Sequence, residues 1–167
     1  MAHQQGGAPQ GREGHDPLRP HRHDPNPHPP SPDPTFQLTC PGQAAQPISL
    51  AALRALPAVS VPDCLIVSTG HGTSGPFTFT GPRLLDLIQA HCPGDWSQVE
   101  VISGDGFGTR VLAGELTDPN LTRPIILAYA VDGRPLSREQ GLVRLIVPSE
   151  TDDALRQVKW VAQVNVR

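Results

Sequence analysis

The sequence predicts an α+β fold, in which one mixed, mainly β-sheet domain carries a few helices and is preceded by a tail. Many short apolar stretches alternate with polar residues or end at Gly, Pro or Asp-Gly, which is typical of strands and turns. One longer stretch, residues 84–91, repeats its apolar residues at helical spacing. Because the strands are not separated by regularly alternating helices, these elements favour an α+β arrangement.

Residues 1–34 differ in composition from everything that follows. They hold nine of the 20 prolines and five of the 7 histidines, and only Met1 and Leu18 are apolar and larger than alanine. Such a segment cannot bury enough apolar surface to offset the entropy of ordering. We therefore expect a disordered Pro/His-rich tail over 1–34 and a domain over 35–167. The run His21–Asp24 is interpreted as part of this solvated tail, because no fold holds its side chains in a ligand geometry.

Charge and apolar patterning exclude several classes of protein. A net charge of -3 and a pI near 6.1 argue against nucleic-acid binding, which requires a basic surface. No apolar run is long enough to span a membrane, and the N-terminus lacks the apolar stretch of a secretory signal. The odd number of cysteines, at positions 40, 64 and 92, predicts reduced thiols rather than disulfides, with Cys40 as a small buried hydrophobe. We therefore expect a cytoplasmic protein.

The first half of the domain is expected to contain both helices. A strand at 36–39 is followed by a short helix with Ser49 as its N-cap and Pro57 as its end. Residues 63–68 read as a buried strand, and residues 69–76 as a loop rich in small residues. A second helix is expected to begin at Gly81-Pro82, with proline in its first turn.

The second half is expected to consist mostly of strands. Asp105-Gly106 and Asp132-Gly133 are strong turn signals, because both residue types tolerate a positive φ. The predicted strands around and after these turns are residues 99–102, 109–112, 125–131, 143–147 and 158–166.

The loop at residues 70–75 is the first candidate site. Its glycines would allow backbone N–H groups to approach an anion, and neighbouring hydroxyl groups would add donors. The alternative is a plain flexible connection, and no lysine follows as a phosphate-binding P-loop requires. His71 in this loop is either a solvent-exposed residue or a donor to a phosphate or metal-oxo group.

Several short segments follow one another along the chain in an order that is informative as a set. They are Thr80–Ile88, Ser103–Phe107, Ile126–Tyr129, Asp132–Leu136, Gly141, Arg144–Pro148 and Val158–Val161. Their order and content resemble the molybdopterin-binding domain of the sulfite oxidase family. This resemblance implies the corresponding fold, a pterin cofactor that carries molybdenum, oxidoreductase activity, and a separate redox partner protein.

The resemblance also implies which residues contact the cofactor. Asp105 and Phe107 match an Asp-Gly-aromatic segment beside the pocket, and Arg110 is close enough to supply charge. Lys159 matches a lysine that reaches towards the pterin or its phosphate. The cofactor-binding residues expected from the loop and from the resemblance are Ser68, Thr69, Gly70, His71, Asp105, Phe107, Arg110 and Lys159. Arg144 follows Gly141 in a similar pattern, but Leu142 stands where the family has proline.

The position that the family uses to bind molybdenum lacks a cysteine here. In catalytic members, a cysteine thiolate at the end of the strand before the variable loop binds the metal, and the matching place falls at Ser68-Thr69-Gly70. Cys64 lies four residues away, which is about 13 Å along a strand, so it is a doubtful ligand. Three alternatives stay open: Ser68 or Thr69 binds the metal, the pterin is bound without redox chemistry as in a non-catalytic binder of pterin or another anionic ligand, or the pocket is empty.

Overall fold

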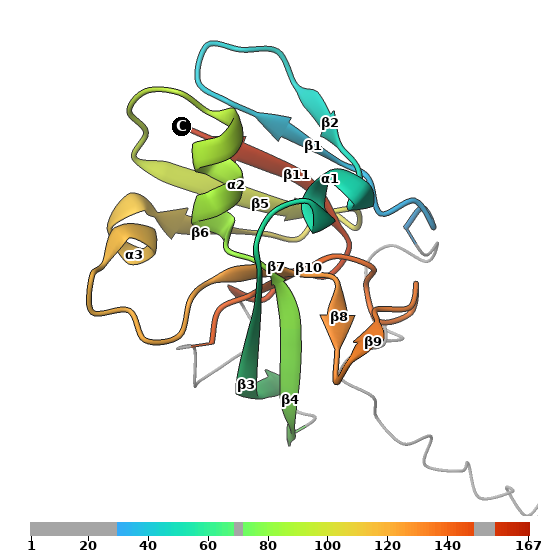
Figure 1. The fold of residues 1–167 in the computed structure, drawn as a ribbon. Coiled ribbons are helices and arrows are strands. Elements are labelled where there is room, and N and C mark those ends of the chain that lie inside the picture. The colour runs from blue at the N-terminus through green and yellow to red at the C-terminus, as the bar shows by residue number, and fades with distance from the viewer. Residues whose placement is uncertain (1–29, 69–71, 149–155) are drawn as a thin grey trace, which may run out of the picture.

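A computed structural model of the chain describes residues 30–68, 72–148 and 156–167 (Figure 1). The described residues form three α-helices and eleven strands. The predicted α+β fold, mainly β with a few helices, is therefore confirmed. Within the described residues, no helix is long and apolar enough to cross a membrane.

A five-stranded sheet forms the larger part of the domain. Its strands are β1 (Phe36–Thr39), β2 (Gln46–Ile48), β5 (Gln98–Ser103), β6 (Gly108–Leu112) and β11 (Val161–Val166). Their order is β2-β1-β11-β5-β6, and β1 pairs in parallel with β11 while the other pairs are antiparallel. The last strand of the chain therefore lies at the centre of the sheet and joins the first strand to β5.

Helices cover one face of this sheet (Figure 1). They are α1 (Leu50–Arg54), α2 (Leu84–His91) and α3 (Ala113–Thr117). Leu84, Leu87 and Ile88 of α2 are fully buried and share a core with the inward side chains of the sheet. The helix α3 was not predicted, because a five-residue helix with one buried residue, Leu116, is too short to show a helical period.

The remaining strands form a second layer that extends away from the first sheet (Figure 1). A long hairpin of β3 (Ala58–Ser68) and β4 (Gly72–Pro82) forms a four-stranded sheet with β8 (Ala130–Val131) and β9 (Arg134–Pro135). The strand order in this sheet is β3-β4-β8-β9. Two further strands, β7 (Ile126–Ala128) and β10 (Arg144–Ile146), pair with each other. Apolar side chains of β3, β4, β7, β8 and β10 form a second, smaller core.

Several predicted local features are confirmed. Ser49 caps α1 by accepting a hydrogen bond from the Ala52 N–H at 3.1 Å. Asp105-Gly106 forms the turn between β5 and β6, and Asp132-Gly133 forms the turn between β8 and β9. Both turn glycines have positive φ, as the turn chemistry requires.

Three predicted boundaries are wrong. The strand predicted at 63–68 begins at Ala58 and is not buried throughout, because Leu65 is 47% exposed. From Gly72 onwards, the predicted loop is the strand β4, which pairs back onto β3. Pro82 is the last residue of β4, and α2 begins at Leu84 after Arg83 as N-cap. In each case sheet pairing overrides the local preference of Gly and Pro for loops and helix starts.

The prediction of three reduced thiols is also wrong. Cys40, just after β1, forms a disulfide with Cys92 at the end of α2, with their Cα atoms 5.3 Å apart. Only Cys64 is free among the cysteines, and it is buried in the second core. The two bonded cysteines are 52 residues apart, so only the packing of α2 on the sheet brings them together.

The first described residues lie against the domain. Pro30 and the residues up to Thr35, which are assigned above mainly to the tail, run beside the start of β11 and line a pocket with it. The division at residue 35 stays a prediction, and residues 1–29 with their five histidines lie outside the described part of the chain.

Gly81 is a position where a small change is expected to destabilise the fold. A Cβ at Gly81 would overlap the backbone of Leu127 and lie 2.8 Å from the Cα of Ala128, and backbone atoms cannot rotate away. We expect Gly81→Ala to lower the free energy of unfolding by about 1–3 kcal/mol, measured by urea denaturation. Gly114→Ala is the matched control, because a Cβ there meets open space. Equal stability of the two variants would contradict the close approach of β4 and β7.

Candidate functional site

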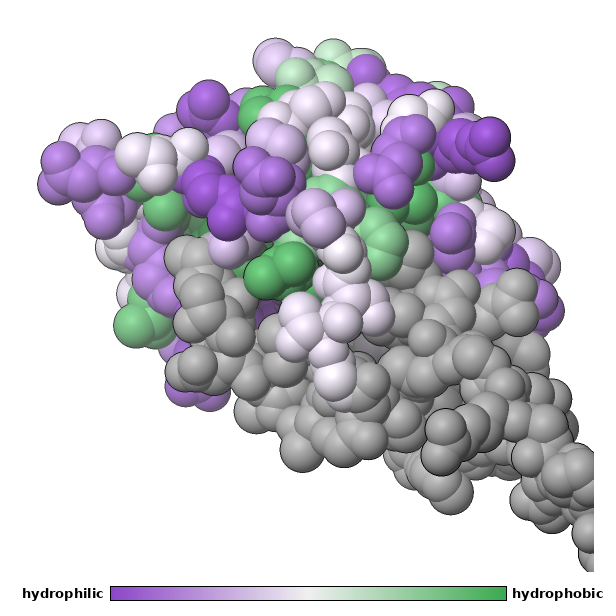
Figure 2. All heavy atoms as spheres, turned by 90° about the horizontal axis from the view of Figure 1, so that it is seen from below, coloured by the Kyte–Doolittle hydropathy of each residue, from purple (hydrophilic) through white to green (hydrophobic). Residues whose placement is uncertain are grey.

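The first group of predicted site residues lies at the free end of the β3–β4 hairpin. Ser68 is the last residue of β3 and pairs with Gly72 of β4. Thr69, Gly70 and His71, which join these two strands, lie outside the described residues. The hairpin points away from the five-stranded sheet (Figure 1). Seen from the side towards which it points, some apolar residues lie near the middle of the coloured surface, and hydrophilic residues lie towards its edges (Figure 2).

Cys64 does not have the properties of a metal ligand. Its thiol is buried and donates to the carbonyl oxygen of Val61 at 3.3 Å. Burial raises the pKa of the Cys64 thiol, and the positive charge of Arg123 offsets this only in part. The side chain is therefore held as a thiol, and a metal would have to reach a buried position and displace its proton. Among the described residues, no three His, Cys, Asp or Glu side chains are grouped so that they could hold a metal ion.

Arg123 is a charged residue of this region that the sequence reasoning missed. Its Nη2 donates to the carbonyl oxygen of Pro62 at 2.6 Å, and its Nη1 donates to that of Pro148 at 3.1 Å. Arg123 thus joins β3 to the segment that follows β10. The sequence gives no sign of this bridge, because the two residues that Arg123 contacts are 61 and 25 positions away along the chain.

Three predicted site residues lie on the β5–β6 hairpin. The carboxylate of Asp105 accepts a hydrogen bond from the Phe107 N–H at 3.0 Å, so one of its oxygens stabilises the turn. Phe107 is 40% exposed, and Arg110 is an exposed residue of β6 opposite Glu100. The turn role of Asp105 agrees with its Asp-Gly sequence, and the exposed Phe107 and Arg110 are open to a ligand or partner.

Lys159 lies beside a second cationic residue, Arg144. A Cβ built on Gly141 would lie 3.2 Å from the Cγ of Arg144 and 3.3 Å from the Cβ of Lys159, so the inner parts of both side chains pack against this glycine. Arg144 is only 2% exposed, and its Nη1 donates to the carbonyl oxygen of Gln140 at 3.0 Å. Two cationic side chains, one of them buried, thus pass close to Gly141.

Arg144 was not among the predicted site residues. The sequence did hold a signal, since an arginine interrupts the otherwise apolar stretch Leu142–Val147. Such a residue in a strand is either exposed or balanced by a partner, and only the fold reveals that its side chain is buried.

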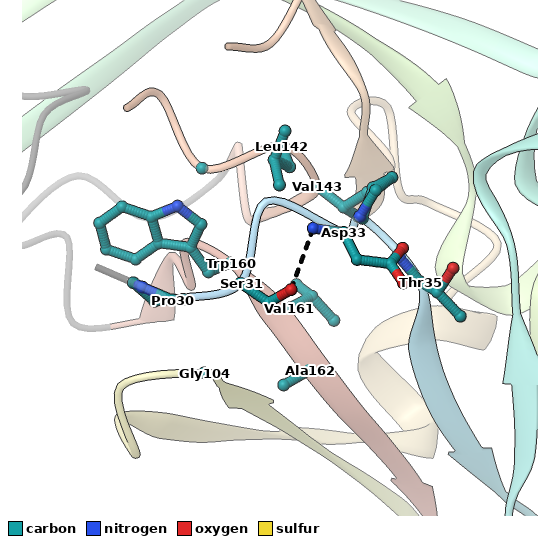
Figure 3. Close-up of a pocket in the computed structure, with 12 residues that line it drawn as sticks. Pro30, Ser31, Asp33, Thr35, Gly104, Leu142, Val143, Trp160, Val161 and Ala162 are labelled. Carbon is teal, nitrogen blue, oxygen red and sulfur yellow. Dashed lines mark hydrogen bonds between the residues drawn. The ribbon is translucent and has the colours of Figure 1, made fainter. Parts of the chain in front are cut away.

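A small pocket joins the β5–β6 hairpin to the neighbourhood of Lys159 (Figure 3). Its volume is about 90 Å³, and its walls come from residues 30–35, Gly104, residues 141–143 and residues 160–162. The Gly104 N–H donates to the carbonyl oxygen of Trp160 at 2.8 Å. The structure therefore brings the turn that contains Asp105 and Phe107 next to Trp160 and Lys159, whereas Ser68 is at the end of a different hairpin.

The side chains near Lys159 are better suited to hold an anionic group than to hold a metal ion. Arg144 and Lys159 can supply positive charge and N–H donors to a phosphate, and Arg110 is an exposed cation of the β5–β6 hairpin. The free thiol of Cys64 is neutral, buried and engaged with a backbone carbonyl.

Comparisons with known proteins point to redox enzymes. The mitochondrial sulfite oxidase of Drosophila melanogaster is 30% identical over 109 residues, which are 60% of this chain and 18% of that protein. The human mitochondrial sulfite oxidase is 33% identical over 66 residues, which are 39% of this chain and 11% of that protein. An inducible NADH nitrate reductase of Glycine max is 41% identical over 64 residues, which are 38% of this chain and 7% of that protein. This chain spans less than a fifth of these relatives.

A solved structure and a family match complete the comparison. The sulfane dehydrogenase SoxCD from Paracoccus pantotrophus has a similar fold, with a TM-score of 0.63 over 79% of this chain and 37% of that chain. Its sequence identity is 17%, so this likeness concerns the fold alone. Residues 25–167, most of the chain, match the family described as the oxidoreductase molybdopterin binding domain. The resemblance inferred from the sequence motifs is thus confirmed: the chain belongs to the oxidoreductase molybdopterin binding domain family.

Proposed function

We propose that this chain binds the pterin of a molybdenum cofactor and that Arg144 and Lys159 hold its anionic end. The observation that carries this proposal is the pair of cationic side chains that pack against Gly141, one of them buried. A phosphate accepts hydrogen bonds from a planar guanidinium and from an ammonium group, and it balances both charges. Phe107 and Arg110 lie on the adjacent hairpin and would contact the exposed side of the ligand.

When bound, the molybdenum of such a cofactor would supply two-electron redox chemistry. The residues of this chain would bind and orient the pterin and exclude water from its buried side. Ser68 or Thr69 is the proposed ligand at the place where the family has a cysteine, and an oxygen ligand is harder than a thiolate. Asp105 would hold the turn beside the pocket through its bond to the Phe107 N–H.

The proposed role is that of a domain or subunit in a molybdenum-dependent oxidoreductase. The sulfite oxidases and the nitrate reductase to which the chain is similar are much longer than this chain. A separate redox partner protein would then receive or supply the electrons. The cytoplasmic location expected above depended on the lack of a visible secretory signal and on reduced thiols; the second argument no longer holds. The Cys40–Cys92 disulfide removes that support and favours an oxidising compartment.

The second candidate function is pterin binding without redox chemistry. The observation that favours it is the neutral, buried thiol of Cys64, together with Ser68 at the place of the usual thiolate. In that case the anion site at Arg144 and Lys159 would be occupied while molybdenum is absent.

One experiment separates these functions. The protein is produced in a host that makes the cofactor, and molybdenum and pterin are then measured per mole of purified protein. Equal amounts of both support the oxidoreductase, and pterin without molybdenum supports the non-catalytic binder. A protein that carries neither, from a host with abundant cofactor, would rule out both functions.

Lys159→Ala is expected to reduce the amount of pterin that the protein retains roughly tenfold, because a charged hydrogen bond contributes about 1.5–3 kcal/mol. Lys159→Arg should retain more pterin than Lys159→Ala, and Arg134→Ala, at an exposed arginine of β9, is the control. Full pterin retention by Lys159→Ala would show that Lys159 does not bind the cofactor.

A further inference from the structure

The segment from Pro30 to Thr35, which we call the strap, is attached to the domain at two places. A Cβ built on Gly104 would lie 3.0 Å from the Cβ of Pro30, so the proline ring packs against this glycine. The Nε and Nη2 of Arg138 both donate to the carbonyl oxygen of Pro30, at 3.3 and 3.0 Å. The strap then runs past Val161 to the start of β1 (Figure 3).

The residues that the strap contacts are also those that hold Trp160. The Gly104 N–H donates to the Trp160 carbonyl oxygen at 2.8 Å, and the indole Nε1 donates to the carbonyl oxygen of Arg138 at 2.7 Å. Pro30 thus touches two of the three hydrogen-bond partners of Trp160. The third is the Gly141 carbonyl oxygen, which accepts from the Trp160 N–H at 3.1 Å. Figure 3 shows Pro30, Gly104 and Trp160 on the same side of the pocket.

Trp160 needs such support because its backbone has an unusual conformation. Its φ is +46°, a left-handed conformation that a residue with a side chain adopts only when its surroundings hold it. Leu142, which faces it across the pocket, also has a positive φ of 57°. Lys159 directly precedes Trp160, and its Nζ lies 5.6 Å from the centre of the indole ring. The direction of the Lys159 side chain therefore depends on the conformation of Trp160.

We propose that Pro30 and Arg138 are positioning residues of the anion site, because the strap holds Trp160 in its left-handed conformation and thereby keeps Lys159 beside Arg144. This inference rests on the proposed function for its effect on the ligand, whereas the effect on Trp160 does not depend on any ligand. Neither Pro30 nor Arg138 needs to touch the pterin in order to influence how tightly it is held.

The test uses two variants of the full chain in a Trp96→Phe background, which leaves Trp160 as the only tryptophan. Gly104→Ala pushes against Pro30, and Arg138→Gln removes the guanidinium that binds its carbonyl oxygen. Gly114→Ala, where a Cβ meets open space, and Arg134→Gln are the matched controls. Quenching of Trp160 fluorescence by acrylamide measures how exposed the Trp160 side chain is. The pterin content before and after dialysis measures how tightly the anion site holds its ligand.

We expect both variants to expose Trp160, which is 5% exposed, to the quencher and to reduce pterin retention roughly tenfold, as contacting residues typically couple. Both controls should behave like the parent protein, and the melting temperature serves to separate this effect from general loss of stability. Unchanged quenching in both variants would overturn the proposal, and so would exposed Trp160 with full pterin retention. If the parent protein holds no pterin, the proposed function fails, and the quenching still decides whether the strap holds Trp160.

Discussion

Loss of the Cys40–Cys92 disulfide is expected to lower the free energy of unfolding by about 4 kcal/mol, within a usual range of about 2–5 kcal/mol. The bond closes a chain segment of 52 residues, and a cross-link across a segment of this length removes much of the entropy of the unfolded chain. It also ties the end of α2 to the end of β1, so that the helix is fastened to the sheet that it covers. The measurement is urea denaturation of the parent and of the double variant Cys40→Ala/Cys92→Ala.

Reduction provides an independent control for this prediction. A thiol reductant should destabilise the parent protein by a similar amount and should leave the double variant unchanged, because Cys64 forms no disulfide. Titration of the unfolded, non-reduced protein should find one free thiol, whereas reduction should yield three. Three thiols without reduction would contradict the bond and would restore the support for a cytoplasmic location.

Replacement of Arg144 by methionine is expected to weaken pterin retention by on the order of a hundredfold, because loss of one partner of a buried charge pair costs about 2–5 kcal/mol. Methionine is unbranched and uncharged, so it fills much of the space of the buried side chain. The variant also loses the hydrogen bond from Arg144 to the Gln140 carbonyl oxygen, so we expect some loss of stability beside the effect on the ligand. The measurements are pterin content after dialysis and urea denaturation of the pterin-free protein.

Arg144→Lys is the matched control for this variant. Lysine keeps the positive charge but lacks the planar guanidinium, so its pterin retention should lie between those of the parent and Arg144→Met. Normal pterin retention in Arg144→Met, combined with a large loss of stability, would assign Arg144 to the fold and not to the site. Lys159 would then be the remaining cation in this part of the proposed site.

The local chemistry of the chain allowed several elements to be predicted. Ser49 caps α1 as expected, since its hydroxyl group satisfies an N–H group within three residues. The Asp-Gly turns at 105–106 and 132–133 are formed by the residues that tolerate their conformation. The apolar spacing of α2 was likewise visible, and its buried face consists of Leu84, Leu87 and Ile88. Each of these features depends on residues close together in the chain.

Features that depend on distant residues were missed or wrongly predicted. Gly72 to Pro76 looked like a loop and Gly81-Pro82 like a helix start, yet pairing with the eleven residues of β3 makes both segments part of the strand β4. The spacing of the cysteines gave no sign of the bond between Cys40 and Cys92. The bridge of Arg123 between Pro62 and Pro148 was equally invisible.

The features of the candidate site also fall into those that could be read from nearby residues and those that depend on distant ones. The sequence by itself determined the family, the turn at Asp105, and Lys159 as a candidate, because motif order and turn residues can be read along the chain. Only the tertiary structure decided that Arg144 is buried beside Lys159, that the strap holds Trp160, and that Cys64 is a neutral core thiol. The physical reason is that burial and the pairing of charges depend on contacts between residues far apart in sequence, which arise only when the sheets pack.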